Sequence, residues 1–245
     1  MIVWVIIKMR LKRIIILVDE STRSYPVKAY IKYAIVGNVI NSRVSPTIYE
    51  EALRIIKDYS EMYDVHDIKN HYMIRVYRDY LWRLKIDPTK TRPSHEALLR
   101  RVLRTHEFPR INTIVDIGNL ISLKYLVPVG LYDLNKLDPP LSIRSSVSGD
   151  LFHPIGSDLV KEIPPGRPLL ADKEKVIHIF PSRDSRLSSI DLSTNSVLIT
   201  VMGVEGVPLT TVSKALDSLI DYITRYTAGE NKIVRMGKVI WFGGI

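Results

Sequence analysis

The stretches RINTIVDIGN (residues 110–119) and PVGLYDL (residues 128–134) decide how this chain is interpreted. A helix from about Asn112 to Tyr125 would be apolar nearly all round, which predicts that it is buried on more than one face. Within it, Asn112, Asp116 and Asn119 fall inside an arc of about 60°. A buried polar group without a partner costs about 1–3 kcal/mol. These three side chains therefore either cap neighbouring loops or line a cleft, and both interpretations stay open.

The residues before this helix predict strands followed by three helices. Apolar, β-branched runs indicate strands at Ile14–Val18 and Tyr33–Ile40, and Ile2–Ile7 is a further strand candidate. Serine–proline and proline–serine pairs are typical of helix starts. The apolar periodicity predicts helices that begin at Ser45-Pro46, run from about Asp67 to Leu84, and run from Pro93-Ser94 to about Thr105.

The residues after this helix predict a β-rich region. Short apolar runs alternate with proline, glycine, aspartate and serine turns from Pro128 to Gly206. One amphipathic helix follows over Val212–Tyr226, and Ile233–Phe242 is typical of an edge strand. Helices, then many short strands, then a helix indicate an α+β fold rather than a doubly wound sheet.

The charge of the chain is strongly positive and unevenly distributed. Lysine and arginine number 35 against 26 aspartate and glutamate, a net charge of +9. Eleven basic and four acidic residues lie between Lys69 and Arg110. Such an excess suggests a polyanionic partner, a nucleic acid or an anionic membrane, and a solvated surface is the alternative. The arginines expected to face outward and bind nucleic acid are Arg75, Arg78, Arg83, Arg100, Arg101 and Arg104.

Several chemistries lack their sequence signatures. The absence of cysteine excludes disulfides and a cysteine nucleophile. No phosphate-binding loop, dinucleotide fingerprint or GxSxG motif occurs, and the six histidines show no HxxxH spacing, so no cofactor and no metal are expected. Ile2–Ile7 is far shorter than the ~20 residues that cross a membrane. We expect a cytoplasmic protein without a membrane partner, starting at Met1 or Met9.

The two opening stretches resemble the B3/B4 domain of the phenylalanyl-tRNA synthetase β subunit. In that family they read roughly RPINNVVDVTN and PLHAFDL, and STNSVL (193–198) resembles the family's ETTNIL. Stand-alone B3/B4 proteins resemble the chain more closely, from about Val18 to Tyr226. They share RPS (92–94), EALLRR (96–101), the spacing of Gly149, Phe152, Pro154 and Gly156, and RDS (183–185).

The resemblance implies a fold and a reaction. The fold would have a β-rich core of short strands flanked by helices, with residues 1–91 as a helical extension packed on a core of residues 92–245 in one compact unit. The synthetase domain hydrolyses tyrosine mischarged onto phenylalanine tRNA, and water attack on the ester needs no covalent nucleophile. The chain is too short for a synthetase subunit, so the resemblance implies no ligase activity.

The resemblance also implies which residues form the site. The histidine of the family's PLHAFDL is Gly130 here, so the synthetase's own pocket does not carry over. An arginine such as Arg92 or Arg183 would bind a carboxylate or phosphate, and Asp116 or Asp184 an α-amino group or water. Residues expected to be catalytic are Asp184, Arg183 and Ser185. Residues expected to bind substrate are Arg92, Ser94, Glu96, Asn112, Asp116, Asn119, Tyr132 and Asp133.

Two functions remain open at this point. One is hydrolytic editing of mischarged tRNA in trans. The other is a non-catalytic module that binds an amino acid, a small metabolite or RNA. The sequence decides neither the substrate, nor the oligomeric state, nor whether the protein is an enzyme.

Overall fold

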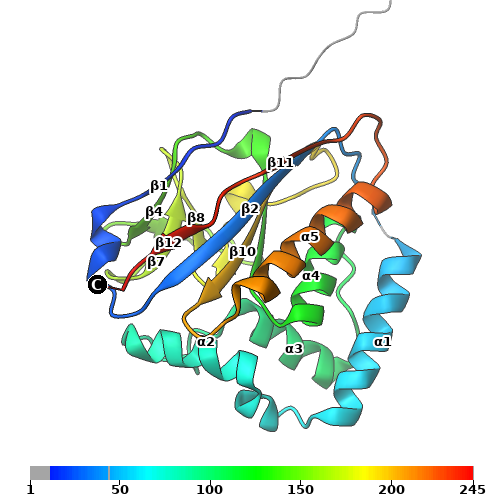
Figure 1. Cartoon of the computed structure of the whole chain (residues 1–245), viewed down its shortest axis with the longest axis horizontal. Helices are drawn as coiled ribbons and strands as arrows, with labels where there is room; N and C mark the ends of the chain where they lie inside the picture. The colour runs from blue at the N-terminus through cyan, green and yellow to red at the C-terminus, as the bar shows by residue number, and fades with distance from the viewer. Residues whose placement is uncertain (1–11, 44, 245) are drawn as a thin grey trace, which may run out of the picture.

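The computed structural model describes residues 12–43 and 45–244 as two packed β-sheets with five α-helices (Figure 1). The strand candidate Ile2–Ile7 lies outside these residues. Within them, no helix has the length and hydropathy needed to span a membrane. The mixed composition of elements confirms the expected α+β class.

The first sheet is built around two long strands. β2 (Ala29–Gly37) and β10 (Ser196–Val204) pair antiparallel along their whole length. β3 (Val129–Asp133) pairs with the far edge of β10, while β11 (Ile233–Met236) and β12 (Ile240–Phe242) both pair with β2. All nine residues of β10 are buried because both faces of this sheet are covered.

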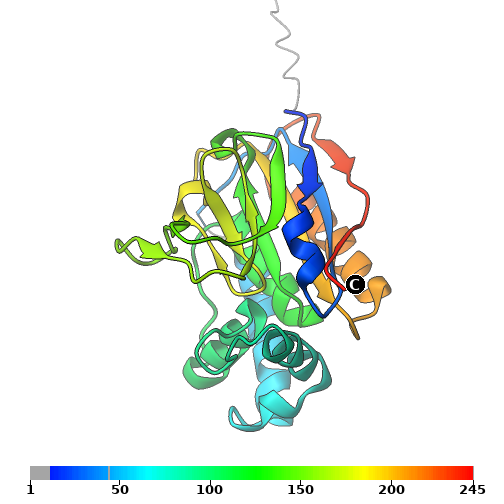
Figure 2. The same cartoon turned by 90° about the vertical axis from the view of Figure 1, so that its left-hand side faces the viewer.

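The second sheet has the order β1-β4-β7-β8-β9. Its strands are β1 (Ile16–Val18), β4 (Leu141–Ser145), β7 (Pro168–Ala171), β8 (Val176–Ile179) and β9 (Arg183–Asp184). Only β1 and β4 are parallel; the other neighbours are antiparallel. A separate hairpin projects from the body, where Figure 2 shows it in yellow-green. It consists of β5 (Leu151–Phe152) and β6 (Lys161–Glu162).

The helices form a layer on the side of the first sheet that is opposite the second sheet. α4 (Thr113–Tyr125) and α5 (Leu209–Tyr226) lie against it, as Figure 1 shows. α1 (Pro46–Met62), α2 (Tyr72–Arg83) and α3 (Ser94–Thr105) are the remaining helices. The expected helix from Asp67 to Leu84 is wrong at its start. Residues Asp67–Asn70 form a separate 3₁₀ turn, and the His71 side chain caps α2 by accepting from the Met73 N–H at 3.2 Å.

The second predicted strand is also displaced. It spans residues 29–37 instead of 33–40, because Asn38 adopts a left-handed φ of 60° that ends the extended run. One main apolar core extends from Ile14 to Phe242 and includes residues on both sides of the expected boundary after residue 91. The division into 1–91 and 92–245 stays a prediction.

Candidate functional site

The most distinctive polar contact of the second sheet joins His178 to Asp184. The two residues are opposite one another in the pairing of β8 with β9, and 2.5 Å separates His178 Nδ1 from Asp184 Oδ1. The imidazole is buried, with the Phe180 ring 4.5 Å away between centroids. The Asp184 side chain is 26% exposed. One carboxylate oxygen is thus held by the histidine, and the carboxylate still reaches solvent.

Asp184 lines a pocket of about 430 Å³, a size typical of small-molecule sites. We call it the acidic pocket, because Asp184 is the one charged side chain among the described residues around it. Helices α3 and α4, strand β3 and the loops after β5 and β9 form its walls. The lining residues are Ser94, Leu98, Ile111, Val115, Gly118, Asn119, Ser122, Val129, Leu131, Ile155, Asp184, Ser189 and Ile190.

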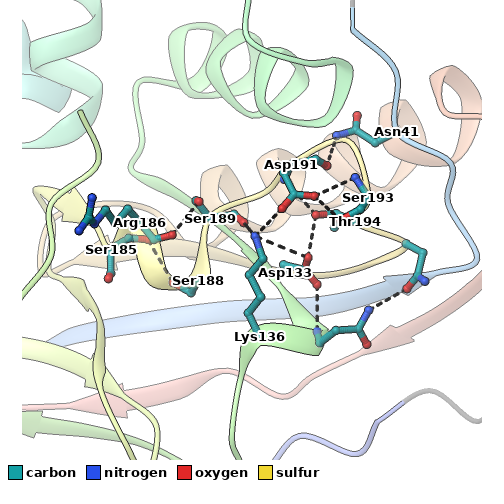
Figure 3. A network of polar contacts seen from close by, with 12 residues as sticks. Asn41, Asp133, Lys136, Ser185, Arg186, Ser188, Ser189, Asp191, Ser193 and Thr194 are labelled. Atoms are coloured by element: carbon teal, nitrogen blue, oxygen red, sulfur yellow. Dashed lines mark hydrogen bonds and ion pairs between the residues drawn. The ribbon is translucent and has the colours of Figure 1, made fainter. Parts of the chain in front are cut away.

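A polar network holds the loop that supplies Ser189 and Ile190 (Figure 3). The Lys136 ammonium donates to the Ser189 carbonyl and to Asp191 Oδ2, each at 2.7 Å. The bond from Lys136 to Asp191, with those from Ser193, lowers the pKa of Asp191. On the far side of the loop, the Asn41 amide donates to the Asp191 carbonyl at 2.8 Å. The loop is therefore tied both to the turn after β3 and to the segment after β2.

The acidic pocket combines one fixed carboxylate with mostly apolar walls. A carboxylate binds an ammonium group or orients a water molecule, and the apolar walls accept a hydrophobic side chain. The Ser94 hydroxyl is buried and has no hydrogen-bond partner among the described residues. Throughout residues 12–43 and 45–244, no three histidine, aspartate or glutamate side chains gather closely enough to hold a metal ion. The arrangement suits an amino acid or its ester.

Comparison with known proteins identifies the family. A family model described as B3/4 domain matches residues 76–231, more than half of the chain. The chain belongs to the B3/4 domain family.

Relatives of this B3/4 domain protein include two phenylalanine–tRNA ligase β subunits. The one from Synechocystis is 24% identical over 149 residues, which are 58% of this chain and 18% of the relative. The one from Fusobacterium nucleatum is 30% identical over 123 residues, 50% of this chain and 15% of the relative. The chain thus matches less than a fifth of the length of either subunit.

A solved structure is also similar. It is an N-terminal fragment of the phenylalanyl-tRNA synthetase β subunit from Pyrococcus horikoshii, with a TM-score of 0.47 and 16% sequence identity. The alignment covers 91% of this chain and 51% of the fragment.

Five of the residues predicted for the site line pockets in this B3/4 domain. Ser94, Asn119 and Asp184 lie together in the acidic pocket. Arg92 and Arg183 line a second pocket of about 420 Å³. We call this second site the basic pocket, because its described lining includes the cations Lys90, Arg92, Lys161, Arg167 and Arg183.

Glu96 lines neither pocket. Its side chain is fully buried, and it accepts from Arg78 Nη1 and Arg100 Nε, both at 2.9 Å. The side chains of Arg78 and Arg100 are each only 16% exposed. The expectation that these two arginines face outward is therefore wrong. All three residues form an internal ion-pair cluster between α2 and α3.

Asn112 and Asp116 serve the start of α4. The Asn112 side chain accepts from the Val115 N–H at 3.0 Å, and Asp116 accepts from the Ile111 N–H at 2.9 Å. Both side chains are buried. Burial raises the pKa of Asp116 to about 6. Of the polar stripe on this helix, the capping interpretation fits Asn112 and Asp116, while Asn119 lines the acidic pocket.

The other three predicted residues hold local structure. The Ser185 hydroxyl accepts from the Leu187 N–H at 3.2 Å, which starts a 3₁₀ turn. Asp133 accepts from the Thr194 hydroxyl at 2.8 Å within the network of Figure 3. Tyr132 is fully buried, and burial together with the nearby Asp184 carboxylate raises its pKa well above the usual value. None of these three lines the acidic pocket.

The surroundings of Gly130 leave no room for the histidine that the resemblance implied at this position. A Cβ atom at Gly130 would collide with the hydroxyl of Tyr132 and lie 2.6 Å from Thr200 Oγ1. The space beside Gly130 is therefore filled by the tyrosine. A glycine is required here for close approach, because any larger side chain displaces Tyr132.

The remaining arginines of the predicted RNA surface are exposed. Arg75, Arg101 and Arg104 face solvent, and Arg83 is exposed while pairing with Glu205 at 3.0 Å. Arg110, outside the predicted set, stacks on the Tyr49 ring with its guanidinium carbon 3.6 Å from the ring centroid.

His178, Lys136 and Ser189 were not predicted as parts of the site. A usable signal existed for His178, which is a polar residue inside an apolar run six positions before Asp184. Lys136 and Ser189 are brought together by contacts between distant segments and carry no local pattern.

Proposed function

We propose that this protein hydrolyses mischarged aminoacyl-tRNA in trans. The observation that carries the proposal is the acidic pocket, in which a carboxylate held at 2.5 Å by a buried histidine faces an apolar cavity of about 430 Å³. The relationship to the B3/4 domain of phenylalanine–tRNA ligase β subunits supports tRNA as the partner. The amino-acid side chain would contact the apolar wall, and Asp184 would act at the ester.

In the proposed reaction Asp184 orients a water molecule and accepts its proton. The water oxygen attacks the carbonyl carbon of the ester, and the bond from that carbon to the ribose oxygen breaks. The ribose oxygen receives the proton, which leaves a free amino acid and a deacylated tRNA. The donors in the described lining that could hold the oxyanion are the Ser94 hydroxyl and the Asn119 amide, since that lining contains no cation.

The test is deacylation of tyrosine-charged phenylalanine tRNA, with correctly charged tRNA as the comparison substrate. Because a general base contributes about 10²–10⁴-fold, Asp184→Asn should slow hydrolysis at least about 100-fold. Asp158→Asn is the matched control, since Asp158 is a fully exposed carboxylate paired with Arg186. No rate above buffer with any of several aminoacyl-tRNAs would overturn the proposal.

The neutral lining around Asp184 favours one alternative, a module that binds an amino acid without hydrolysing its ester. A single carboxylate suffices to bind an α-amino group, whereas stabilisation of an oxyanion is stronger with a cation, which the described lining lacks. A thermal-shift screen with free amino acids tests this function. Binding raises the melting temperature by mass action, and Asp184→Asn should abolish that rise.

A further inference from the structure

The basic pocket is not used by the proposed hydrolysis, and its lining is strongly unbalanced in charge. Five cationic side chains face a single carboxylate, Glu162. Glu162 Oε1 already accepts from the Gly149 N–H at 2.9 Å. A concave surface lined by one sign of charge concentrates ligands of the opposite sign. The lining therefore predicts an anionic ligand.

The five cations also have no ion-pair partner within the described part of the chain. None of Lys90, Arg92, Lys161, Arg167 and Arg183 forms an ion pair with another described residue. By contrast, the nearby Arg144 makes two bonds to Asp150, at 2.6 and 2.7 Å. Arg144 is therefore neutralised within the protein, whereas the cations of the basic pocket are available for a counter-charge from outside.

Arg167 gives a second, independent indication. Its Nη1 atom is buried and has no hydrogen-bond partner within the described residues. Burial also lowers the pKa of this arginine. An unpaired buried donor is unfavourable, more so when it carries charge. A ligand that brings acceptor oxygens into the basic pocket would offset this cost.

The two pockets share a wall, so an anion in the basic pocket and an ester in the acidic pocket would lie on either side of it. Arg183 and Asp184 are successive residues of β9, so their side chains leave opposite faces of that strand. Pro154 and Ile155 divide in the same way, with Pro154 on the basic pocket and Ile155 on the acidic pocket. The start of α3 borders both, and a helix N-terminus adds positive potential.

We propose that the basic pocket binds a phosphate of the RNA whose aminoacylated end enters the acidic pocket. Guanidinium groups bind phosphate through two parallel hydrogen bonds, and Arg92 and Arg183 are placed to do so from neighbouring segments. The assignment to RNA rests on the proposed function. A free nucleotide offers the same phosphate chemistry, and the experiment distinguishes the two sources.

The experiment measures binding of a labelled oligoribonucleotide that has the 3′-terminal sequence of tRNA and carries no amino acid. Binding is measured by fluorescence anisotropy at several salt concentrations. We expect Arg92→Gln and Arg183→Gln each to weaken binding about 10-fold. The slope of log affinity against log salt should fall by about 0.7 for each lost phosphate contact. Arg225→Gln, at an exposed arginine on α5, is the matched control and should change affinity less than 2-fold.

Two further arms make the result decisive. The lysine variants Arg92→Lys and Arg183→Lys keep the charge and should restore the salt slope, which separates phosphate binding from a loss of folding. Competition by inorganic phosphate or adenosine monophosphate at concentrations that match RNA binding would overturn the assignment to RNA. Equal affinities for the pocket variants and the Arg225→Gln control would overturn the phosphate site. Because this RNA carries no amino acid, its binding is measured independently of hydrolysis. A failure of hydrolysis in the Asp184 test would therefore not affect this result.

Discussion

The acidic and basic pockets have nearly equal volumes, about 430 and 420 Å³, and opposite chemistry. Both are built from the start of α3, the segment around residue 154 and strand β9. Their chemistry differs because neighbouring side chains of the shared wall point into different pockets. Two adjacent residues, Arg183 and Asp184, thereby give opposite charges to two separate cavities.

The two pockets also differ in how their charges are supported. Asp184 is held by a buried histidine, whereas the five cations of the basic pocket have no carboxylate partner among the described residues. A fixed group is suited to orienting a reacting atom, because its position does not depend on the ligand. Unpaired cations are suited to binding, because the ligand supplies the missing charge. This contrast underlies our division into a reaction pocket and a phosphate pocket.

The largest expected effect breaks both pockets at once. Glu96→Ala leaves Arg78 and Arg100 without their buried carboxylate, and such a loss typically costs about 3–5 kcal/mol. Because Ser94 and Arg92 flank the start of the same helix, hydrolysis and RNA binding should both decline. Urea unfolding measures the stability change. The control Glu205→Ala, in an exposed pair with Arg83, should cost less than about 1 kcal/mol. Similar losses for the two variants would show that the buried cluster is not special.

A smaller effect should reach only the acidic side. Gly130→Ala puts a methyl group against the Tyr132 hydroxyl, and overpacking of this kind costs about 1–3 kcal/mol. Tyr132→Phe removes the hydroxyl, so the double variant should recover part of the loss. Thermal unfolding of the single and double variants gives this coupling. Strictly additive effects would contradict the contact. RNA binding in the basic pocket should be unchanged by Gly130→Ala.

An effect that appears only as the pH changes concerns the α4 wall of the acidic pocket. The pKa of Asp116 is about 6 in the folded protein against a usual 3.8. Its protonated form therefore adds stability that is full below about pH 4 and is lost as the pH rises through 6. Asp116→Asn keeps an acceptor for the Ile111 N–H but cannot ionise.

The stability of Asp116→Asn relative to the unmodified protein should therefore rise between pH 4 and pH 8. The expected change is on the order of 2 kcal/mol, because one pKa unit corresponds to about 1.4 kcal/mol. Melting temperatures across this range measure it. A difference that does not vary with pH would show that Asp116 titrates normally.

Much of the fold was predictable because it depends on local patterns. The nearly continuous apolar character of residues 112–125 located α4 within one residue of its observed bounds. The α3 helix begins at Ser94, next to the proline that marked its start. By contrast, the end of β2 depends on a left-handed residue, Asn38, which periodicity does not reveal.

The site was predictable where sequence spacing carried it and not where tertiary contacts did. Ser94, Asn119 and Asp184 come together as the shared motifs implied. The same reasoning placed Arg78 and Arg100 in solvent, because helical periodicity does not distinguish water from a buried carboxylate on a neighbouring helix. It also placed Arg92 and Arg183 in one cleft with Asp184. The structure puts them in a different pocket, because residues adjacent in sequence can face different cavities.

The position of β2 in the first sheet has a consequence for how the protein is made. Its neighbours β10, β11 and β12 all come from the last fifth of the chain. At a synthesis rate of about 5–20 residues per second, a ribosome exposes β2 on the order of 10 seconds before β10 emerges. Throughout that interval a nine-residue, largely apolar strand has two unpaired edges, which is the form most prone to aggregate. The first sheet can therefore form only after residues 196–204 have been synthesised and can pair with β2.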